Sequence, residues 1–214
     1  MIAEIGHFSL ILALAVSIVQ MVVPLVGAAR GNAAWMATAA PAALIQMACI
    51  ATAFGCLMYS FVISDFTVAN VMQNSNSLQP MIYKVSATWG NHEGSMVLWV
   101  LILAVFGAMV AAFGRNLPPS LKARVLSVQS MTGFGFLLFI LLTSNPFDRV
   151  IPPPLDGRDL NPLLQDPGLA FHPPMLYIGY VGFSMAFSFA IAALIEGKVD
   201  AAWARWVRPW TLVA

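Results

Sequence analysis

Three histidines are the side chains of this sequence best suited to hold a metal or move a proton: His7, His92 and His172. The stretch FHPPMLYIGY places His172 directly before two prolines and a long apolar run. A residue before proline is pushed toward an extended conformation, and proline is tolerated in the first turn of a helix. The sequence therefore predicts extended chain up to His172 and a helix that begins near Pro173 or Pro174.

That position would give His172 a specific chemistry. The N-terminus of a helix is electrically positive, so it disfavours an imidazolium and keeps the ring neutral. A neutral imidazole has the free lone pair that a metal ligand requires. Tyr177 and Tyr180 follow one to two turns later and would form a partly aromatic wall. The alternative is that His172 only caps a helix and contacts lipid head groups, and the local sequence leaves both readings open.

A second motif, WGNHEGSMVLW, contains Trp89, His92 and Glu93 shortly before another apolar run. Its glycines permit a close approach of the backbone or a positive φ angle. Glu93 could accept a hydrogen bond from a nearby histidine and orient its ring. The pair could equally be a polar latch between loops, so the motif is a candidate of uncertain role.

The remaining polar candidates have ordinary explanations beside functional ones. His7 follows Glu4 at the start of an apolar run, where an interfacial histidine is expected. Arg149 and Arg158 could contact an anion or simply lie at the surface. No C-x-x-C-H run, phosphate-binding glycine loop, nucleophile with its base, or zinc-binding cluster is recognisable.

The composition indicates a membrane protein. Of 214 residues, 60% are hydrophobic and 9% are charged, whereas soluble domains carry about 25% charged residues. The net charge of +1 gives no reason to expect nucleic acid as a partner. A membrane-spanning helix needs about 20 apolar residues. We expect an all-α polytopic fold with five spans, at about residues 5–27, 36–63, 96–113, 125–142 and 175–195.

Charge predicts how these helices cross the membrane. Seven of the ten basic residues fall on one side of the predicted spans: Arg30, Arg115, Lys122, Arg124, Lys198, Arg205 and Arg208. Loops rich in Lys and Arg stay in the cytoplasm. The N-terminus and two long ordered loops, about residues 64–95 and 143–174, are therefore predicted to be periplasmic. The C-terminus is predicted to be cytoplasmic, with residues 200–214 as an amphipathic interfacial tail.

Several stretches together resemble one family. IGHFSLILAL, WGNHEGSMVLWVLIL, NPFDRV and PPPLDGRDLNPLLQDPGLAFHPPMLYIGYVGFSMAFSFAIAAL are similar to the amino-terminal part of the CcmF/NrfE family, the haem lyase subunits of cytochrome c maturation. The likeness covers the whole chain, 1–214, as one membrane region. It implies a multi-pass protein of the bacterial inner membrane.

The resemblance also implies a cofactor and partners. The family receives haem from a periplasmic haem chaperone and works with other maturation subunits to attach it to apocytochrome c. His172 matches the first of two outer histidines that ligate this haem. A separate b-type haem is held by histidines later in the family sequence. His92 matches a family motif, which does not make it a ligand.

The family pattern continues beyond the residues present here. Its tryptophan-rich W-G-x-x-W-x-W-D segment is absent from these 214 residues, so we expect a truncated product or a split gene whose remainder is a partner. His172 alone would leave haem iron without a second protein ligand, and this segment alone is expected to be inactive as a lyase. Two alternatives remain: a respiratory or transport subunit that binds quinone or a solute, and a scaffold that does not bind haem.

Overall fold

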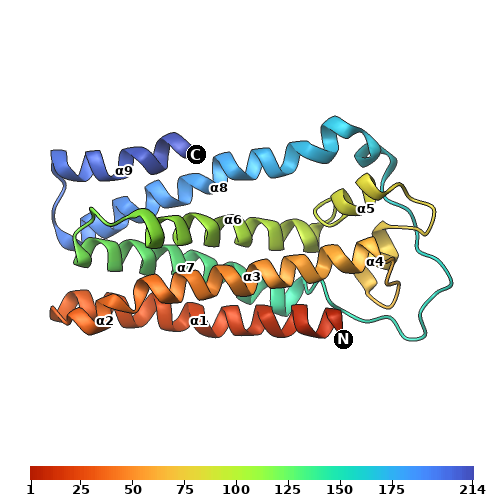
Figure 1. The fold of residues 1–214 in the computed structure, drawn as a ribbon, viewed down its shortest axis with the longest axis horizontal. Coiled ribbons are helices and arrows are strands. Elements are labelled where there is room, and N and C mark those ends of the chain that lie inside the picture. The colour runs from red at the N-terminus through yellow and green to blue at the C-terminus, as the bar shows by residue number, and fades with distance from the viewer.

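Five long apolar helices run side by side along the molecule (Figure 1). They are α1 (Ile2–Arg30), α3 (Ala39–Val62), α6 (His92–Phe113), α7 (Pro119–Thr143) and α8 (Pro167–Glu196). The computed structural model describes all residues from 1 to 214. Each long helix is apolar and long enough to cross a membrane, with the short α2 (Ala33–Ala37) leading into α3. The predicted all-α fold with five candidate spans is confirmed.

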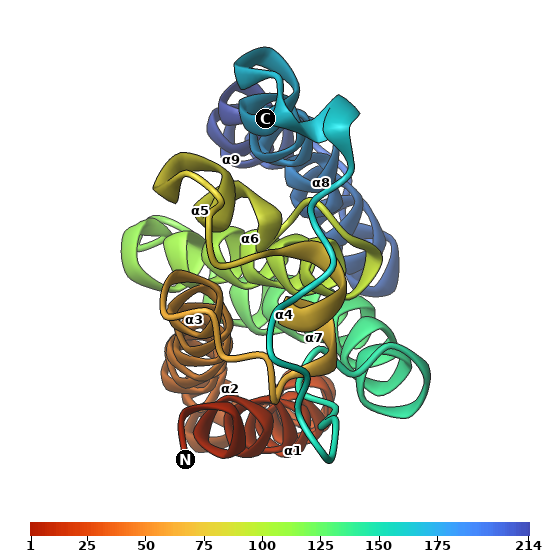
Figure 2. The ribbon, with the colours of Figure 1, turned by 90° about the vertical axis from the view of Figure 1, so that its right-hand side faces the viewer.

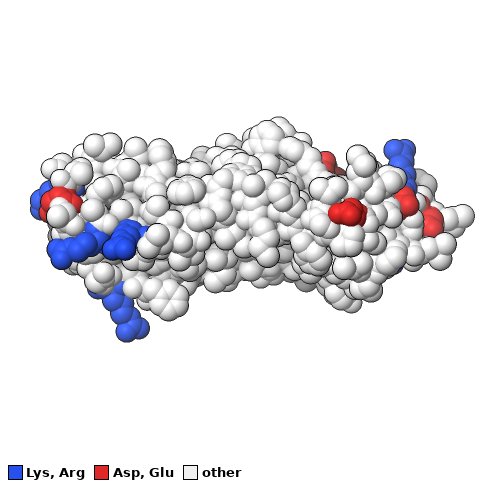
Figure 3. Space-filling view, turned by 90° about the horizontal axis from the view of Figure 1, so that it is seen from above, with Lys and Arg blue, Asp and Glu red and all other residues white.

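The two ends of the bundle differ in chemistry. The chain connections 63–91 and 144–166 lie at one end, called here the loop end, where most of the acidic side chains gather (Figure 3). At the opposite, basic end, arginines and lysines cluster, and the surface between the two ends carries almost no charge in this view (Figure 3). This is the charge distribution that a membrane-spanning bundle requires.

Capping residues extend the helices beyond their predicted limits. The Asn91 side chain accepts a hydrogen bond from the Gly94 amide, so α6 begins at His92 rather than near residue 96. Asp166 caps α8 in the same way. At the basic end, Gly31 and Gly197 adopt left-handed φ angles of 66° and 70° that terminate α1 and α8. Hydropathy locates the apolar centre of each helix, whereas caps decide where it starts and stops.

The prediction of extended chain at His172 is wrong. The helix begins at Pro167, and His172, Pro173 and Pro174 all lie inside it. The proline rule for the preceding residue is a steric bias, and here the Asp166 cap starts the helix and the buried Ala170 anchors it before the prolines. His172 consequently lies beyond the first turn, where the positive end of the helix has lost most of its influence.

The loop end is an ordered layer built from two chain segments. It contains α4 (Ala69–Asn74), α5 (Met81–Ala87) and the short 3₁₀ helix η1 (Pro162–Gln165). Val68 and Arg149 form an isolated antiparallel bridge between the two segments. Val68 and Val71 of the first segment and Leu160 of the second are fully buried in the hydrophobic core. The apolar residues of both segments therefore anchor them on the helix ends.

The C-terminal helix packs on the bundle. α9 (Ala201–Val213) turns back along α8 (Figures 1 and 2). The Trp203 indole donates a hydrogen bond to the Phe189 carbonyl of α8, at 3.2 Å. Trp210 is buried against the bundle, while Arg205 and Arg208 remain exposed. The tryptophan face of this amphipathic helix therefore packs on α8, and its arginines point away from the bundle.

Candidate functional site

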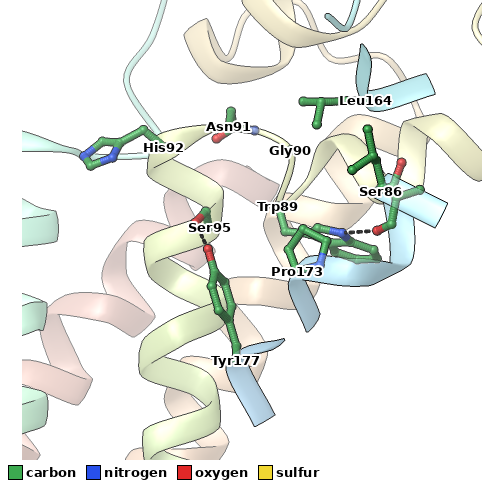
Figure 4. Close-up of a pocket in the computed structure, with 11 residues that line it drawn as sticks. Ser86, Trp89, Gly90, Asn91, His92, Ser95, Leu164, Pro173 and Tyr177 are labelled. Atoms are coloured by element: carbon green, nitrogen blue, oxygen red, sulfur yellow. Dashed lines mark hydrogen bonds between the residues drawn. The ribbon is translucent and has the colours of Figure 1, made fainter. Parts of the chain in front are cut away.

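A cavity of about 300 Å³ lies at the loop end, between α5, the start of α6 and the start of α8 (Figure 4). One wall comes from the WGNHEGS motif and includes Trp89, Asn91 and Ser95. The opposite wall is the face of α8 that carries Leu169, Pro173 and Tyr177. The fold thus brings the WGNHEGS motif and the start of α8 together in space, although they lie some 80 residues apart in the sequence.

Trp89 repairs a defect that proline creates in α8. A proline has no N–H, so Pro174 cannot donate to the carbonyl four residues earlier, that of Ala170. The Trp89 indole N–H donates to this carbonyl instead, at 2.8 Å. Its ring also stacks on Phe54, with centroids 6.5 Å apart. Trp89 therefore fixes the first turns of α8 against the start of α6.

Asn91 holds the other side of the cavity. Its side-chain oxygen accepts from the Gly94 amide at 2.7 Å and from the Asn70 amide at 3.0 Å, while its nitrogen donates to the Ala87 carbonyl at 2.6 Å. A Cβ on Gly94 would lie only 1.7 Å from the Thr88 carbonyl oxygen. Gly94 is therefore required for this close approach, which confirms the prediction that a glycine of this motif permits close contact with the backbone.

An aromatic cluster forms the floor beneath the cavity. The Tyr177 and Ser95 hydroxyls share a hydrogen bond of 2.5 Å. Tyr177, Tyr180 and Trp99 pack with ring centroids 5.0 to 5.7 Å apart. Tyr177 and Tyr180 thus pack with Trp99 of α6, and Tyr177 lies on the cavity side of α8 rather than beside His172.

His92 faces away from this floor. Figure 4 shows its ring directed to the side opposite Tyr177. The ring nitrogen Nε2 lies 3.0 Å from the Ser144 hydroxyl, and the ring meets Phe139 edge-on. The partner of His92 is thus Ser144 rather than the neighbouring Glu93. These contacts match a latch between the start of α6 and the end of α7.

His172 lies on the outer face of α8 and does not line the cavity. Leu169, Pro173 and Tyr177 recur every four residues on the inner face. His172 is exposed and shares the outer face with Phe171, Met175 and Leu176, whose side chains are 48–70% exposed. The structure therefore places the imidazole in an apolar, accessible surface supported from behind by Trp89.

Arg149 and Arg158 differ in whether their guanidinium groups form ion pairs within the protein. Arg149 pairs with Glu4 on α1, and its guanidinium also lies 3.5 Å from a carboxylate oxygen of Asp65. Arg158 is exposed, and its backbone amide is held by the Met72 carbonyl at 2.6 Å. Arg149 ties α1 to the loop end, while Arg158 keeps its guanidinium directed to the surroundings.

Comparison with known proteins decides the family. The model of the cytochrome c assembly protein family matches residues 89–214, which include α6, α7, α8 and all of the cavity lining except Ser86. The chain belongs to the cytochrome c assembly protein family. The cytochrome c-type biogenesis protein ccl1 of Rhodobacter capsulatus is 67% identical over the full chain. The cytochrome c-type biogenesis protein CcmF of Escherichia coli is 53% identical over the same length.

The relatives are much longer than this chain. The chain spans about a third of the length of these relatives, 33% in both cases. A solved structure of a cytochrome c haem lyase CcmF superposes on the whole chain with a TM-score of 0.86 at 24% sequence identity, and the chain covers 33% of it. That similarity shows that the fold of this family member is the one found in CcmF.

Proposed function

We propose that this chain handles haem during cytochrome c maturation, with His172 as an axial ligand of the iron. Membership of the cytochrome c assembly family supports the process, and favours it over a respiratory or transport subunit. The observation that carries the residue assignment is the exposed imidazole of His172 on an apolar face of α8. By contrast, the His92 ring is already engaged by Ser144.

The residues on this face fit a porphyrin. Haem is a flat apolar ring with charged propionates, and Phe171, Met175 and Leu176 offer exposed apolar side chains around the imidazole. The cavity behind α8, at about 300 Å³, is at the lower limit for enclosing even a drug-sized ligand. Haem would therefore lie against the outer face, with Arg158 as a candidate for a propionate. Haem and the client thiols supply the bond-forming chemistry.

The proposal includes a location and partners. Basic residues at one end of the bundle support a cytoplasmic basic end and a periplasmic loop end in the inner membrane. Haem would then arrive from a periplasmic haem chaperone and leave to apocytochrome c, with other maturation subunits assembled around this one. A second axial ligand would come from outside residues 1–214, in keeping with the greater length of the relatives.

The test uses the assembled maturation complex. His172→Ala should remove the axial-ligand signature from the Soret and α bands and lower the yield of c-type cytochrome. Added imidazole should restore the spectrum, because it can occupy the space left by the missing ring. His7→Ala, a half-buried histidine of α1, is the matched control and should change neither readout. Unchanged spectra in the His172 variant would reject the assignment.

A further inference from the structure

A small cavity lies inside the bundle, enclosed by α1, α3, α6 and α7. Three glutamines line it: Gln20, Gln46 and Gln129. Each is at least 95% buried, in a region otherwise filled by apolar side chains. Gln20 lies ten residues before the end of α1, about 15 Å from the basic end. Polar side chains at that depth need hydrogen-bond partners, because neither lipid nor apolar residues supply them.

Gln20 lacks one of its partners. Its Nε2 donates to the Leu126 carbonyl of α7 at 3.0 Å. Turning the amide over would set two oxygens against each other, so the orientation is fixed. Its Oε1 is buried and accepts no hydrogen bond from the protein. Gln129, in contrast, is satisfied at both ends by Leu103, Ser184 and Ser188.

The size of the cavity selects the ligand. Its volume, counted as the space open to the centre of a water molecule, is about 10 Å³. That is room for one water and nothing larger. No carboxylate lines the cavity, so no charge is present to compensate a cation. The Gln46 amide lies on the same cavity and offers a second polar group beside Gln20.

We propose that one water molecule is bound in this cavity as a structural part of the bundle. It donates a hydrogen bond to Gln20 Oε1 and bridges to the Gln46 amide, thereby linking α1 to α3. Waters buried in this manner satisfy polar groups that the protein cannot pair by itself. The site is enclosed by four helices of this chain and is independent of haem handling.

Alanine substitutions at two glycines of α7 test this proposal, because the sign of their difference in stability depends on whether the cavity holds water. A Cβ on Gly133 would lie 3.5 Å from Gln46 Nε2, an ordinary contact, whereas a Cβ on Gly135 would meet nothing within 4 Å. In a dry cavity, Gly133→Ala would fill a void and stabilise at least as much as Gly135→Ala. With water present, the methyl group displaces it and leaves Gln20 unpaired. In a full-length protein about three times as long as this chain, we expect the melting temperature of Gly133→Ala to be about 1 °C below that of Gly135→Ala.

A double-mutant cycle on the full-length protein in nanodiscs identifies the cause. Gln20→Met keeps the side-chain length but removes the unpaired acceptor. If the water bridges to Gln20, the penalty of Gly133→Ala should disappear in the Gln20→Met background. A penalty that persists would point to a clash with Gln46 and overturn the proposal. Equal or higher stability of Gly133→Ala relative to Gly135→Ala would overturn it as well.

Discussion

At the scale of single residues, the conformation of the His-Pro-Pro sequence depends on Trp89, which lies far from it in the sequence. Two adjacent prolines remove two hydrogen bonds from the second turn of α8. The Trp89 indole supplies one of the two missing donors, to the Ala170 carbonyl. Because His172 lies two residues from Ala170 on the same turn, its position depends on this contact. Trp89 thus positions the haem-ligand candidate without touching the ligand.

Replacing Trp89 by phenylalanine tests this role. Trp89→Phe keeps the aromatic stacking on Phe54 but removes the N–H, which leaves the carbonyl of the buried Ala170 unpaired. The expected cost is about 1–3 kcal/mol of stability, with faster amide hydrogen exchange in residues 167–176. Trp35→Phe, at an exposed position of α2, is the control. Unchanged exchange in α8 would show that the indole bond is not needed.

Asp156 predicts a pH dependence at the loop end. The Ser77 hydroxyl donates to its carboxylate at 2.7 Å, and the Ser77 and Gly157 amides donate to it as well. These hydrogen bonds, led by that of the Ser77 hydroxyl, lower the pKa of Asp156. A depressed pKa stabilises the fold above the unfolded value of about 3.9, and this contribution is lost as the pH falls below it.

The measurement is hydrogen exchange, corrected for the intrinsic effect of pH on exchange rates. Residues 75–79 and 154–160 should lose protection when the pH falls from 6 to below the depressed pKa of Asp156, because protonated Asp156 holds Ser77 less strongly. Asp156→Asn should show low protection at both pH values and therefore little pH response. A response of the same size in that variant would assign the effect to another group.

At the scale of elements, the long helices are joined by side chains that bond to backbone carbonyls across their interfaces. Ser127 and Ser130 of α7 donate to the carbonyls of Gln20 and Ser17 on α1, at 3.1 and 3.0 Å. Small hydroxyl residues permit close packing of apolar helices and supply such bonds within the membrane. This explains why α1 and α7 pack closely although neither helix has a strongly polar face.

Gln129 makes the equivalent connection for α7, α6 and α8. It donates to the Leu103 carbonyl and the Ser184 hydroxyl and accepts from the Ser188 hydroxyl. Gln129→Leu removes all three bonds and should cost about 1–2 kcal/mol, seen as easier unfolding of α8 in denaturant titrations. Met131→Leu, at an exposed position of the same helix, should have little effect. Equal stability of the two variants would refute the role of Gln129.

The sequence predicts the long helices more accurately than it predicts where they end and which residues they contact. Apolar runs of about 20 residues reveal spans because length and hydropathy are local properties. The caps Asn91 and Asp166 were readable signals, and their use would have placed His172 inside α8. The bond between Trp89 and Ala170 joins residues 81 positions apart, so no local pattern could predict it. The same holds for Ser144 as the partner of His92.

The folded-back tail shows another limit of local patterns. Tryptophans on one face and arginines on the other predict an amphipathic helix but not the surface it covers. In the structure that surface is α8: the Gly197 turn and the Asp200 cap start a new helix, and its Trp203 indole donates to the Phe189 carbonyl of α8. The same amphipathic pattern suits packing on an apolar helix and binding to a lipid interface, so the sequence alone does not distinguish the two.

At the scale of the whole molecule, the charge difference between the two ends predicts the orientation in the membrane. Loops rich in lysine and arginine are generally retained in the cytoplasm during insertion, whereas acidic residues have little influence, so we expect the basic end to be cytoplasmic. The haem proposal depends on this orientation, because His172 must lie on the side where apocytochrome c matures. An experiment on orientation therefore tests the proposal without requiring haem.

Accessible cysteines provide that experiment in intact cells. Leu155 is fully exposed at the loop end, and Asn116 is exposed in the connection between α6 and α7 at the basic end. In a background where Cys49 and Cys56 are alanine, a membrane-impermeant maleimide should label Leu155→Cys directly. Asn116→Cys should react only after the membrane is permeabilised, because we expect the basic end to face the cytoplasm. The reverse pattern would place His172 on the cytoplasmic side, and haem delivery to periplasmic clients through this residue would then be impossible.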